Sequence, residues 1–269
     1  MEDGAADFIS RVFIWQGRTL FLGPLPDHLL HRQMATSLCM GLSGPVRIER
    51  DQGIESGLIH LIPTGQRHRL ITDQTPVAIL FFDPHSLMAK SISQRKLDST
   101  YETFRRGVQK LLQVQEDQVL SVLSEIPVKD SIAANHAKHS VPNELYRDPR
   151  IATIVRTVVT EPGRYSREEL ANLVGISGSR LSHIFTDQVG VSLRLLSSWF
   201  RLKLAAIHLS KGASMVESAL EAGFYDQSHF SNEFKKMFGL SPGNLFRSAA
   251  SIQWWIQDEK STQSILAAR

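Results

Sequence analysis

The chain has 269 residues, which is long for one helical module and sufficient for two domains. Residues 148–250 hold twelve Lys and Arg against nine Asp and Glu, so the whole formal charge of +3 lies there, the sign that phosphate contact needs. The single cysteine, Cys39, excludes an intramolecular disulfide and a cysteine-based zinc site. The N-terminus is acidic and polar, and no apolar stretch approaches a membrane span. These features predict a cytoplasmic protein with no signal peptide and no membrane contact.

The first part of the chain, from about residue 8 to residue 84, has the pattern of short strands. Its apolar runs are broken every few residues by Gly, Pro or Asp, which favours antiparallel strands closing into a sandwich or barrel. The spacing of Gly57, Pro63, Gly65 and His68 resembles the second half of the cupin motif. That resemblance implies a small jelly-roll β-barrel with His68 pointing into it.

A metal site in this barrel would need more ligands than the sequence provides. His31 is followed two residues later by Gln33 instead of a second histidine, no Glu stands at the expected distance, and Thr72 replaces the usual final Asn. Since most metal sites need three or more protein ligands, we expect no metal, no cofactor and no catalytic residue. His31, Gln33 and His68 are instead candidates for binding a small organic effector, although the barrel could also serve only for dimerisation. The alternative is a metal-dependent cupin enzyme fused to the C-terminal region.

Residues 86–125 read as helical, because Pro and Gly nearly vanish and apolar residues recur at helical spacing. This stripe consists of Val108, Leu111, Leu112, Val119, Leu120 and Leu123. It fits a helix packed on its own domain and equally a helix paired with its twin in a homodimer. Residues 127–147 then read as a linker, and Asp148 and Pro149 as the cap and first residue of the next helix.

One pattern occurs twice in the last hundred residues. Its two copies are Ser166, Glu169, Ala171, Gly175 and Ser214, Glu217, Ala219, Gly223. Ser-x-x-Glu is a capping box that opens a helix, and the glycine allows the chain to turn out of it. An apolar pair spaced by four follows each copy and indicates a second helix: Leu181 with Phe185, and Phe230 with Phe234. The pattern predicts two helix-turn-helix units.

The region from about residue 148 to residue 247 resembles the DNA-binding region of the AraC/XylS family of transcription regulators. The densest stretches are ELANLVGISGSRLSHIF, RLKLAAIHL and ALEAGFYDQSHFSNEFKKMFGLSP. The resemblance implies an all-α domain whose two units are joined by a long spacer helix, here capped by Ser192 and stopped by Gly212. It also implies a bacterial regulator that binds double-stranded DNA and RNA polymerase, commonly as an activator, with a homodimer formed through the N-terminal half. Cupin-like sensor domains often precede such a region.

The polar faces of the two second helices supply the predicted DNA-binding residues. These are Ser179, Arg180, Ser182, His183, Gln227, Ser228, His229, Ser231, Asn232, Lys235 and Lys236. Lys235, Lys236 and Arg247 suit phosphate contact, and the family's equivalent of Arg201 more often holds the fold than reads DNA. Asn232 stands where the family usually has Arg, and Leu245 and Phe246 stand where it has an aromatic residue and Arg. The predicted division is a sensor domain at 8–126, a linker at 127–147, a DNA-binding domain at 148–250 and a tail at 251–269.

Overall fold

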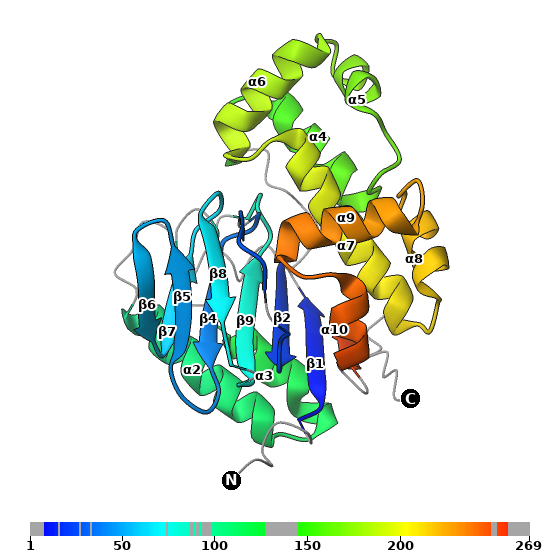
Figure 1. Cartoon of the computed structure of the whole chain (residues 1–269). Helices are drawn as coiled ribbons and strands as arrows, with labels where there is room; N and C mark the ends of the chain where they lie inside the picture. Colours follow the sequence, from blue (N-terminus) through cyan, green and yellow to red (C-terminus); the bar gives the residue numbers. More distant parts are fainter. Residues whose placement is uncertain are drawn as a thin grey trace.

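The computed structural model describes residues 8–15, 17–26, 28–32, 34–73, 75–86, 89, 92, 98–126, 145–248 and 252–257. It has a sheet-rich N-terminal region and a helical C-terminal region, which lie against each other (Figure 1). This α+β, two-part architecture confirms the expected fold class at that level.

A six-stranded sheet forms the centre of the N-terminal region, in the order β10-β1-β2-β9-β4-β7. Its strands are β1 Ser10–Trp15, β2 Arg18–Gly23, β4 Ser37–Gly41, β7 Ile59–Ile62, β9 Val77–Phe82 and β10 Ile252–Ile256. Alternate residues of β1 face opposite sides: Phe13 and Trp15 join one apolar cluster, and Val12 and Ile14 join another. Both faces are therefore covered, which explains why the strands read as nearly continuous apolar runs.

A four-stranded sheet, in the order β3-β8-β5-β6, lies beside the first. Its strands are β3 His31–Arg32, β5 Val46–Arg50, β6 Gly53–Gly57 and β8 Arg67–Ile71. The expected closed jelly-roll barrel is not confirmed, because the strands form two open sheets. The physical reason lies at the edges, where β1 pairs with a strand from the far end of the chain and β6 is almost wholly exposed.

The turn identified from the cupin-like spacing is present. β7 and β8 flank residues 63–66, Gln66 N–H donates to the Pro63 carbonyl at 3.2 Å, and Gly65 has a φ of +85°. A positive φ favours glycine because it has no Cβ. His68, in β8, is buried. Cys39 is also buried, in β4, and burial raises the pKa of its thiol to about 12, so it behaves as a small apolar residue.

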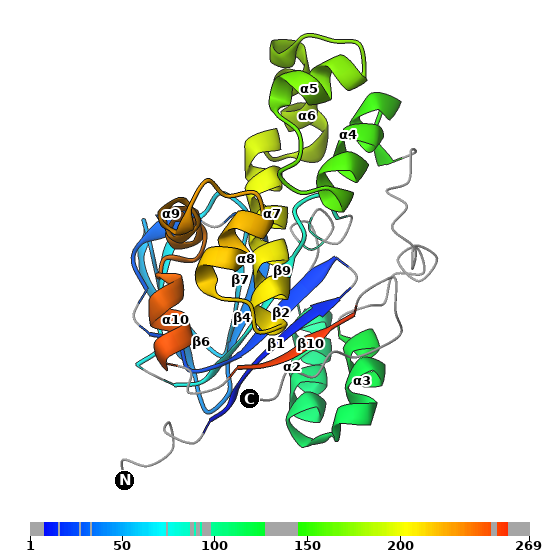
Figure 2. The same cartoon turned by 90° about the vertical axis from the view of Figure 1, so that its right-hand side faces the viewer.

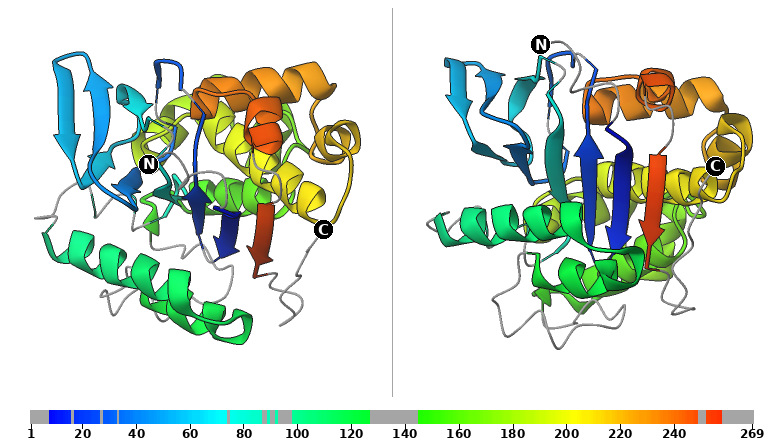
Figure 3. Two further views of the ribbon diagram at one scale, coloured as in Figure 1. Left: turned by 60° about the horizontal axis from the view of Figure 1, so that its bottom comes forward. Right: turned by 90° about the horizontal axis from the view of Figure 1, so that it is seen from below.

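Helices α2 (Asp98–Gln113) and α3 (Val119–Glu125), joined by the short η1 (Glu116–Gln118), cover one face of the six-stranded sheet. In Figure 3 they lie on one side of the strands, with the C-terminal helices on the other. Val108, Leu111, Val119 and Leu123 of the apolar stripe are buried against the sheet. The stripe therefore packs on its own domain, and only Leu112 at 38% is a clearly exposed member.

The C-terminal region contains both predicted helix-turn-helix units. Its helices are α4 Pro149–Thr160, α5 Arg167–Leu173, α6 Gly178–Val189, α7 Leu193–Ser210, α8 Met215–Glu221, α9 Gln227–Phe238 and α10 Pro242–Ser248. Both capping boxes are formed, at Ser166 with Glu169 and at Ser214 with Glu217. Gly175 and Gly223 have φ values of +68° and +79°, as the turns require. None of the helices among the described residues is both long and apolar enough to span a membrane.

The predicted tail contains a strand that the sequence analysis did not find. β10 pairs in parallel with β1, from Ser10 opposite Ile252 to Ile14 opposite Ile256 (Figure 2). Trp255 stacks on Phe13 with ring centroids 4.8 Å apart. The end of the helical region is therefore bound into the sheet of the N-terminal region.

Candidate DNA-binding surface and interdomain pocket

The second helix of each unit presents a polar outer face. In α6, Ser177 caps the helix by accepting from the Arg180 N–H, and Leu181 and Phe185 are buried in the core. Ser179, Arg180 and His183 are exposed. Ser182 is half-buried, and its hydroxyl donates to the Gly178 carbonyl at 3.0 Å. The first unit thus offers three exposed polar side chains on its second helix, and the Ser179 hydroxyl lies 3.2 Å from that of Ser177.

In α9 some of the predicted DNA-binding residues are exposed, and others make contacts within the domain. The exposed ones are Gln227, Ser228, Asn232, Lys235 and Lys236, and Ser231 is half-buried. His229 is half-buried and stabilises the turn before α9. Its Nδ1 accepts from the Tyr225 N–H at 3.3 Å, and its ring lies edge-on to Phe224. The N-cap is Asp226, which accepts from the His229 N–H at 2.7 Å. Tyr225, just before this cap, is 86% exposed and was not among the predicted contacts.

Glu233 ties α9 to the spacer helix α7. Its carboxylate is buried and accepts from the Ser198 hydroxyl at 3.1 Å and from the Lys236 ammonium at 2.9 Å. Lys236 is therefore partly engaged within the domain, whereas Lys235 is exposed on the same helix. Arg201 packs beside Gly163, whose added Cβ would lie 2.8 Å from the arginine Nε, which fits the expected role in holding the fold. Arg247 lies in α10, but its side chain is outside the described part of the structure.

The spacer helix α7 is formed as predicted. The Ser192 hydroxyl accepts from the Leu195 N–H, and the chain turns at Gly212, with a φ of +86°. The helix has 18 residues, which corresponds to a length of about 27 Å at ~1.5 Å per residue. It therefore connects the two units as one rigid element.

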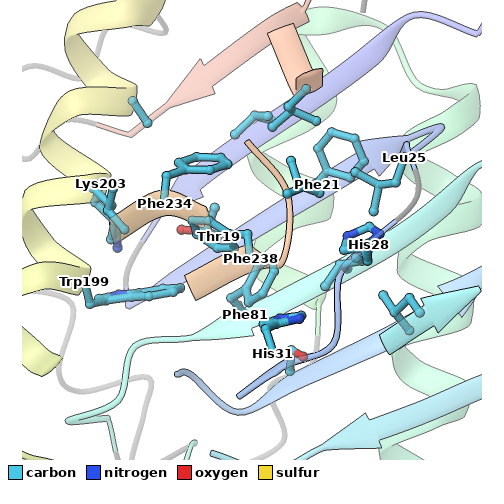
Figure 4. A pocket seen from close by; sticks show the side chains of 18 of the residues that line it. Thr19, Phe21, Leu25, His28, His31, Phe81, Trp199, Lys203, Phe234 and Phe238 are labelled. Carbon is cyan, nitrogen blue, oxygen red and sulfur yellow. The ribbon is translucent and has the colours of Figure 1, made fainter. Parts of the chain in front are cut away.

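A pocket lies between the six-stranded sheet and the helices of the second unit (Figure 4). Its cavity volume is about 120 Å³, and the space extending to its open mouth, which includes solvent, is about 990 Å³. Its aromatic lining residues are Phe21, Phe81, Trp199, Phe234, Phe238, Phe246 and Trp254. Phe234 and Phe238 belong to α9, so a molecule in the pocket would touch the inner side of this helix. Thr19 Oγ1 also lines it, without a hydrogen-bond partner among the described residues.

Three histidines supply one polar side of the pocket. His31 and His68, predicted as effector-binding residues, have ring centroids 4.4 Å apart, and His28 lies 6.4 Å from His31 by the same measure. Gln33, the third predicted residue, lies outside the described residues. Burial, reinforced by the neighbouring His31, lowers the pKa of His28 to about 4 and that of His68 to about 3. Burial also lowers the pKa of His31. All three imidazoles are therefore neutral at pH 7.

Lys203 lies on the opposite side of the pocket from His28 (Figure 4), and it forms a buried ion pair with Asp83 that joins the two regions. Asp83, which follows β9, accepts from the Lys203 ammonium at 3.0 Å on both carboxylate oxygens and from the Trp199 Nε1–H at 2.8 Å. The side chain of Asp83 is 3% exposed and that of Lys203 is 14% exposed. Trp199 and Lys203 stand one turn apart on α7, so one face of the spacer helix is held by the sheet.

The C-terminal end of α9 is seated on β3. The Leu29 N–H donates to the Gly239 carbonyl at 2.7 Å, and a Cβ added at Gly239 would lie 2.7 Å from the Leu29 carbonyl oxygen and closer still to His31. Gly239 therefore has two reasons to be glycine: its φ of +72° and this close approach.

The histidine pocket predicts a pH dependence of stability. Because His28 and His68 have a pKa lowered from 6.5 to about 4 and about 3, the unfolded chain binds protons below pH 6.5 that the folded chain does not. The free energy of unfolding should therefore fall on acidification through this window, by about 1.4 kcal/mol per pH unit for each such histidine. The free energy of unfolding, measured in urea at several pH values, should depend less steeply on pH in His28→Leu than in the parent. An unchanged pH dependence would show that these imidazoles are not excluded from protonation.

The capped double repeat, the exposed polar faces of α6 and α9 and the connecting helix define a double helix-turn-helix DNA-binding domain. This domain is of the AraC type, and a helix-turn-helix domain family matches residues 170–248. Its relatives include the HTH-type transcriptional regulator MtrA of Neisseria gonorrhoeae, 29% identical over 36% of this chain and 33% of that protein. A putative AraC-like transcription regulator of Streptomyces lividans is 33% identical over 36% of this chain and 33% of that protein. The alignments thus span about a third of the relatives' length.

The whole fold also has a counterpart among solved structures. Apo ToxT from Vibrio cholerae strain SCE256, carrying one lysine-to-alanine substitution, superposes with a TM-score of 0.53. The superposition covers 88% of this chain and 99% of that one, at 12% sequence identity. A similarity at this identity concerns the arrangement of sheet and helices. Wild-type ToxT of the same strain is also known with an unsaturated fatty acid bound, at 13% identity over 83% of this chain and 91% of that one (TM-score 0.47).

Proposed function

We propose that this protein is a sequence-specific, DNA-binding transcription regulator whose single chain places two recognition helices in successive major-groove segments. The observation that carries the proposal is the pair of capped helix-turn-helix units with polar, exposed second helices, joined by one spacer helix. The spacer's length of about 27 Å is close to the ~34 Å between major-groove segments on one side of B-DNA. Such a regulator would work on DNA in the bacterial cytoplasm, with RNA polymerase as its further partner and activation as its usual outcome.

We further propose that the interdomain pocket receives a small apolar effector. Its walls come from the sheet, from α7, α9 and α10, and from β10, so a ligand would bear on both halves of the molecule. ToxT binds an unsaturated fatty acid, and an apolar effector is proposed here because of the pocket's own aromatic lining. The proposed division is a sensor region at 8–126, a linker at 127–147 and a DNA-binding domain at 148–250. A homodimer would have to use a surface other than the buried apolar stripe of α2 and α3.

The enzyme alternative has little to support it. The relatives are named as transcription regulators, and the described residues contain no group of three or more His, Cys, Asp and Glu arranged to hold a metal ion. The three pocket histidines lie in an aromatic cavity without a carboxylate among its lining residues. A ligand-binding role suits such a cavity better than metal-assisted catalysis.

The proposal can be tested with the full chain and a pool of random DNA. Repeated selection should enrich one motif, and a footprint on that motif should show two protected segments on one face of the helix. Affinity should fall with salt by about 0.9 log units per log unit of salt for each phosphate neutralised. Failure to enrich any motif, together with equal binding to all sequences, would exclude sequence-specific recognition by this domain.

The two turn glycines allow each unit to be disabled separately. Gly223→Val should remove protection over one segment of the footprint, because a β-branched residue at a φ of +79° is strained and the turn before α9 cannot form. Gly175→Val is the matched change, since a Cβ there meets nothing within 4 Å and only the φ of +68° opposes it. It should remove the other segment. Both variants protecting both segments would contradict the assignment of one groove to each unit.

Asn232 and Lys235 should differ in what they contribute to binding. Asn232→Ala should relax selectivity at one or two base pairs by about 1–3 kcal/mol, because an amide can pair in two-pronged fashion with adenine. Lys235→Ala should weaken binding to all sequences alike and reduce the salt dependence by about one phosphate. Binding of each variant to the selected motif and to its single-base variants measures both effects. An equal loss on every sequence from Asn232→Ala would make it a backbone contact.

A further inference from the structure

The histidines of the pocket have a defined hydrogen-bonding state. His31 Nδ1 lies 3.0 Å from the Leu29 carbonyl oxygen, and His68 Nδ1 lies 3.4 Å from that of Gln66. A carbonyl oxygen can only accept, so in both rings Nδ1 carries the hydrogen and donates it. In a neutral imidazole the other nitrogen, Nε2, is then an acceptor with a free lone pair.

His28 has a buried ring nitrogen without a partner. Its Nδ1 makes no hydrogen bond to the described residues, and the residue is 6% exposed and lines the pocket. A buried polar atom left unpaired is costly, so a ligand group that hydrogen-bonds to it gains affinity.

The neutral state of these rings is supported by their surroundings. Burial lowers the pKa of all three, and the charged or titratable groups that line the pocket are His28, His31, His68 and Lys203. The Nε2 atoms of His31 and His68 are acceptors, because their Nδ1–H groups are donated to backbone carbonyls. The Arg50 guanidinium acts on His68 as a positive charge, and it is ion-paired with Glu55.

The remaining charged group of the pocket is already matched. Lys203 is bound by both oxygens of Asp83 at 3.0 Å. A ligand carboxylate placed at Lys203 would lie beside the buried Asp83 carboxylate, and one placed at the histidines would meet the Nε2 lone pairs of His31 and His68. Taking a carboxylate out of water without a partner is costly, so neither side of the pocket suits an anion.

We infer that the effector is an uncharged, largely apolar molecule carrying a hydrogen-bond donor, such as an alcohol or phenol hydroxyl, which it gives to the histidine cluster at His28, His31 and His68. The inference rests on the proposed regulatory function for its biological meaning, but the pocket chemistry is tested independently of DNA. The aromatic walls hold the apolar body, and the hydroxyl satisfies the buried Nδ1 of His28.

The test uses ten-carbon probes of equal length and different heads on the full chain. Decanol has a donor, decanone only an acceptor, and decanoate a negative charge. Trp199 and Trp254 line the pocket, so intrinsic fluorescence reports binding. Decanol should bind roughly tenfold to a hundredfold more tightly than decanone or decanoate at neutral pH, because an acceptor or anion leaves the imidazole lone pairs unpaired.

Two changes at one position separate hydrogen bonding from packing. His28→Leu removes a ring nitrogen while the Nε2 acceptors of His31 and His68 stay, so the preference for decanol over decanone should shrink. His28→Asn keeps a polar amide near the place of Nδ1, so more of the preference should remain. Equal preferences in these two variants would show that His28 does not select the head group. Asp83→Asn should improve decanoate binding relative to decanol, because it leaves the Lys203 charge free.

Several outcomes would overturn the inference. These are decanoate or decanone binding as tightly as decanol, no probe binding at all, or about one transition-metal ion per purified chain that is lost in His68→Ala. Footprinting of the same preparation on the selected DNA motif distinguishes a failure of the proposed ligand class from a failure of the proposed regulatory function. Intact footprints without decanol preference defeat the ligand class alone, whereas decanol binding without specific footprints defeats the regulatory function alone.

Discussion

Asp83→Ala should lower the free energy of unfolding by about 3–5 kcal/mol, because it leaves the Lys203 ammonium buried without its counter-charge. It also removes the acceptor of the Trp199 Nε1–H. The two carboxylate oxygens and the ammonium lie at 3.0 Å in a site where the Asp83 side chain is 3% exposed, so solvent screens this pair little. The loss of stability should appear as a lower urea midpoint, with an unchanged dependence of the unfolding free energy on urea concentration.

A double replacement separates the charge from the contact. Asp83→Asn combined with Lys203→Met removes both charges and keeps an amide oxygen for the Trp199 N–H. It should recover most of the stability, since a neutral pair of similar volume carries no desolvation penalty. The stability change of the double variant, minus the sum of the changes in Asp83→Asn and in Lys203→Met alone, gives the coupling energy of the pair. Single variants within about 0.5 kcal/mol of the parent would show that the pair is hydrated.

A stop codon at Ser251 should be at least as damaging, because it removes β10. Trp254, Trp255 and Ile256 are buried, and Trp255 stacks on Phe13. Losing one buried tryptophan side chain typically costs about 3–5 kcal/mol, which compares with about 5–15 kcal/mol for a whole domain. The free edge of β1 would also be open to pairing with other chains. We therefore expect low stability in urea and aggregation on concentration.

The matched control is a stop codon at Asp258, which keeps β10 and removes only residues beyond the described part of the chain. It should unfold at the same urea concentration as the parent. Trp255→Ala in the full-length chain should lie between the two truncations. Equal stability of the Ser251 and Asp258 truncations would mean that β10 does not contribute to the fold.

The helix-turn-helix repeat could be predicted because its determinants are local. A capping box joins residues three apart, and a turn glycine needs only its own φ, so Ser166, Glu169 and Gly175 carry their meaning within a few residues. The outward polar faces of α6 and α9 follow from helical periodicity in the same way. His229 shows the limit of this reasoning, because its imidazole accepts from the Tyr225 N–H in the turn. The base and phosphate contacts themselves stay predictions.

Two of the residues predicted to bind an effector, His31 and His68, line one pocket, and their role in binding stays a prediction. The turn at Pro63 and Gly65 placed His68 on a strand, and His31 was selected with it, but their shared cavity also contains α9 and β10 residues. No sequence pattern links Phe234 or Trp254 to His68. Trp199 and Lys203 stand one turn apart on α7, so the sequence shows that they could share a partner. It does not show which residue that is, because Asp83 lies 120 residues from Lys203.

The sequence by itself determined the secondary structure of the C-terminal domain, its two turns and its spacer helix, since these depend on interactions between near neighbours. The tertiary structure decided how the sheets end, where the tail goes and what the pocket contains. Parallel pairing of β1 with β10 joins Ser10 to Ile252, and only the packed structure brings such distant strands together. The acceptor state of His31 and His68 likewise depends on the carbonyl groups that the folded backbone places beside their rings.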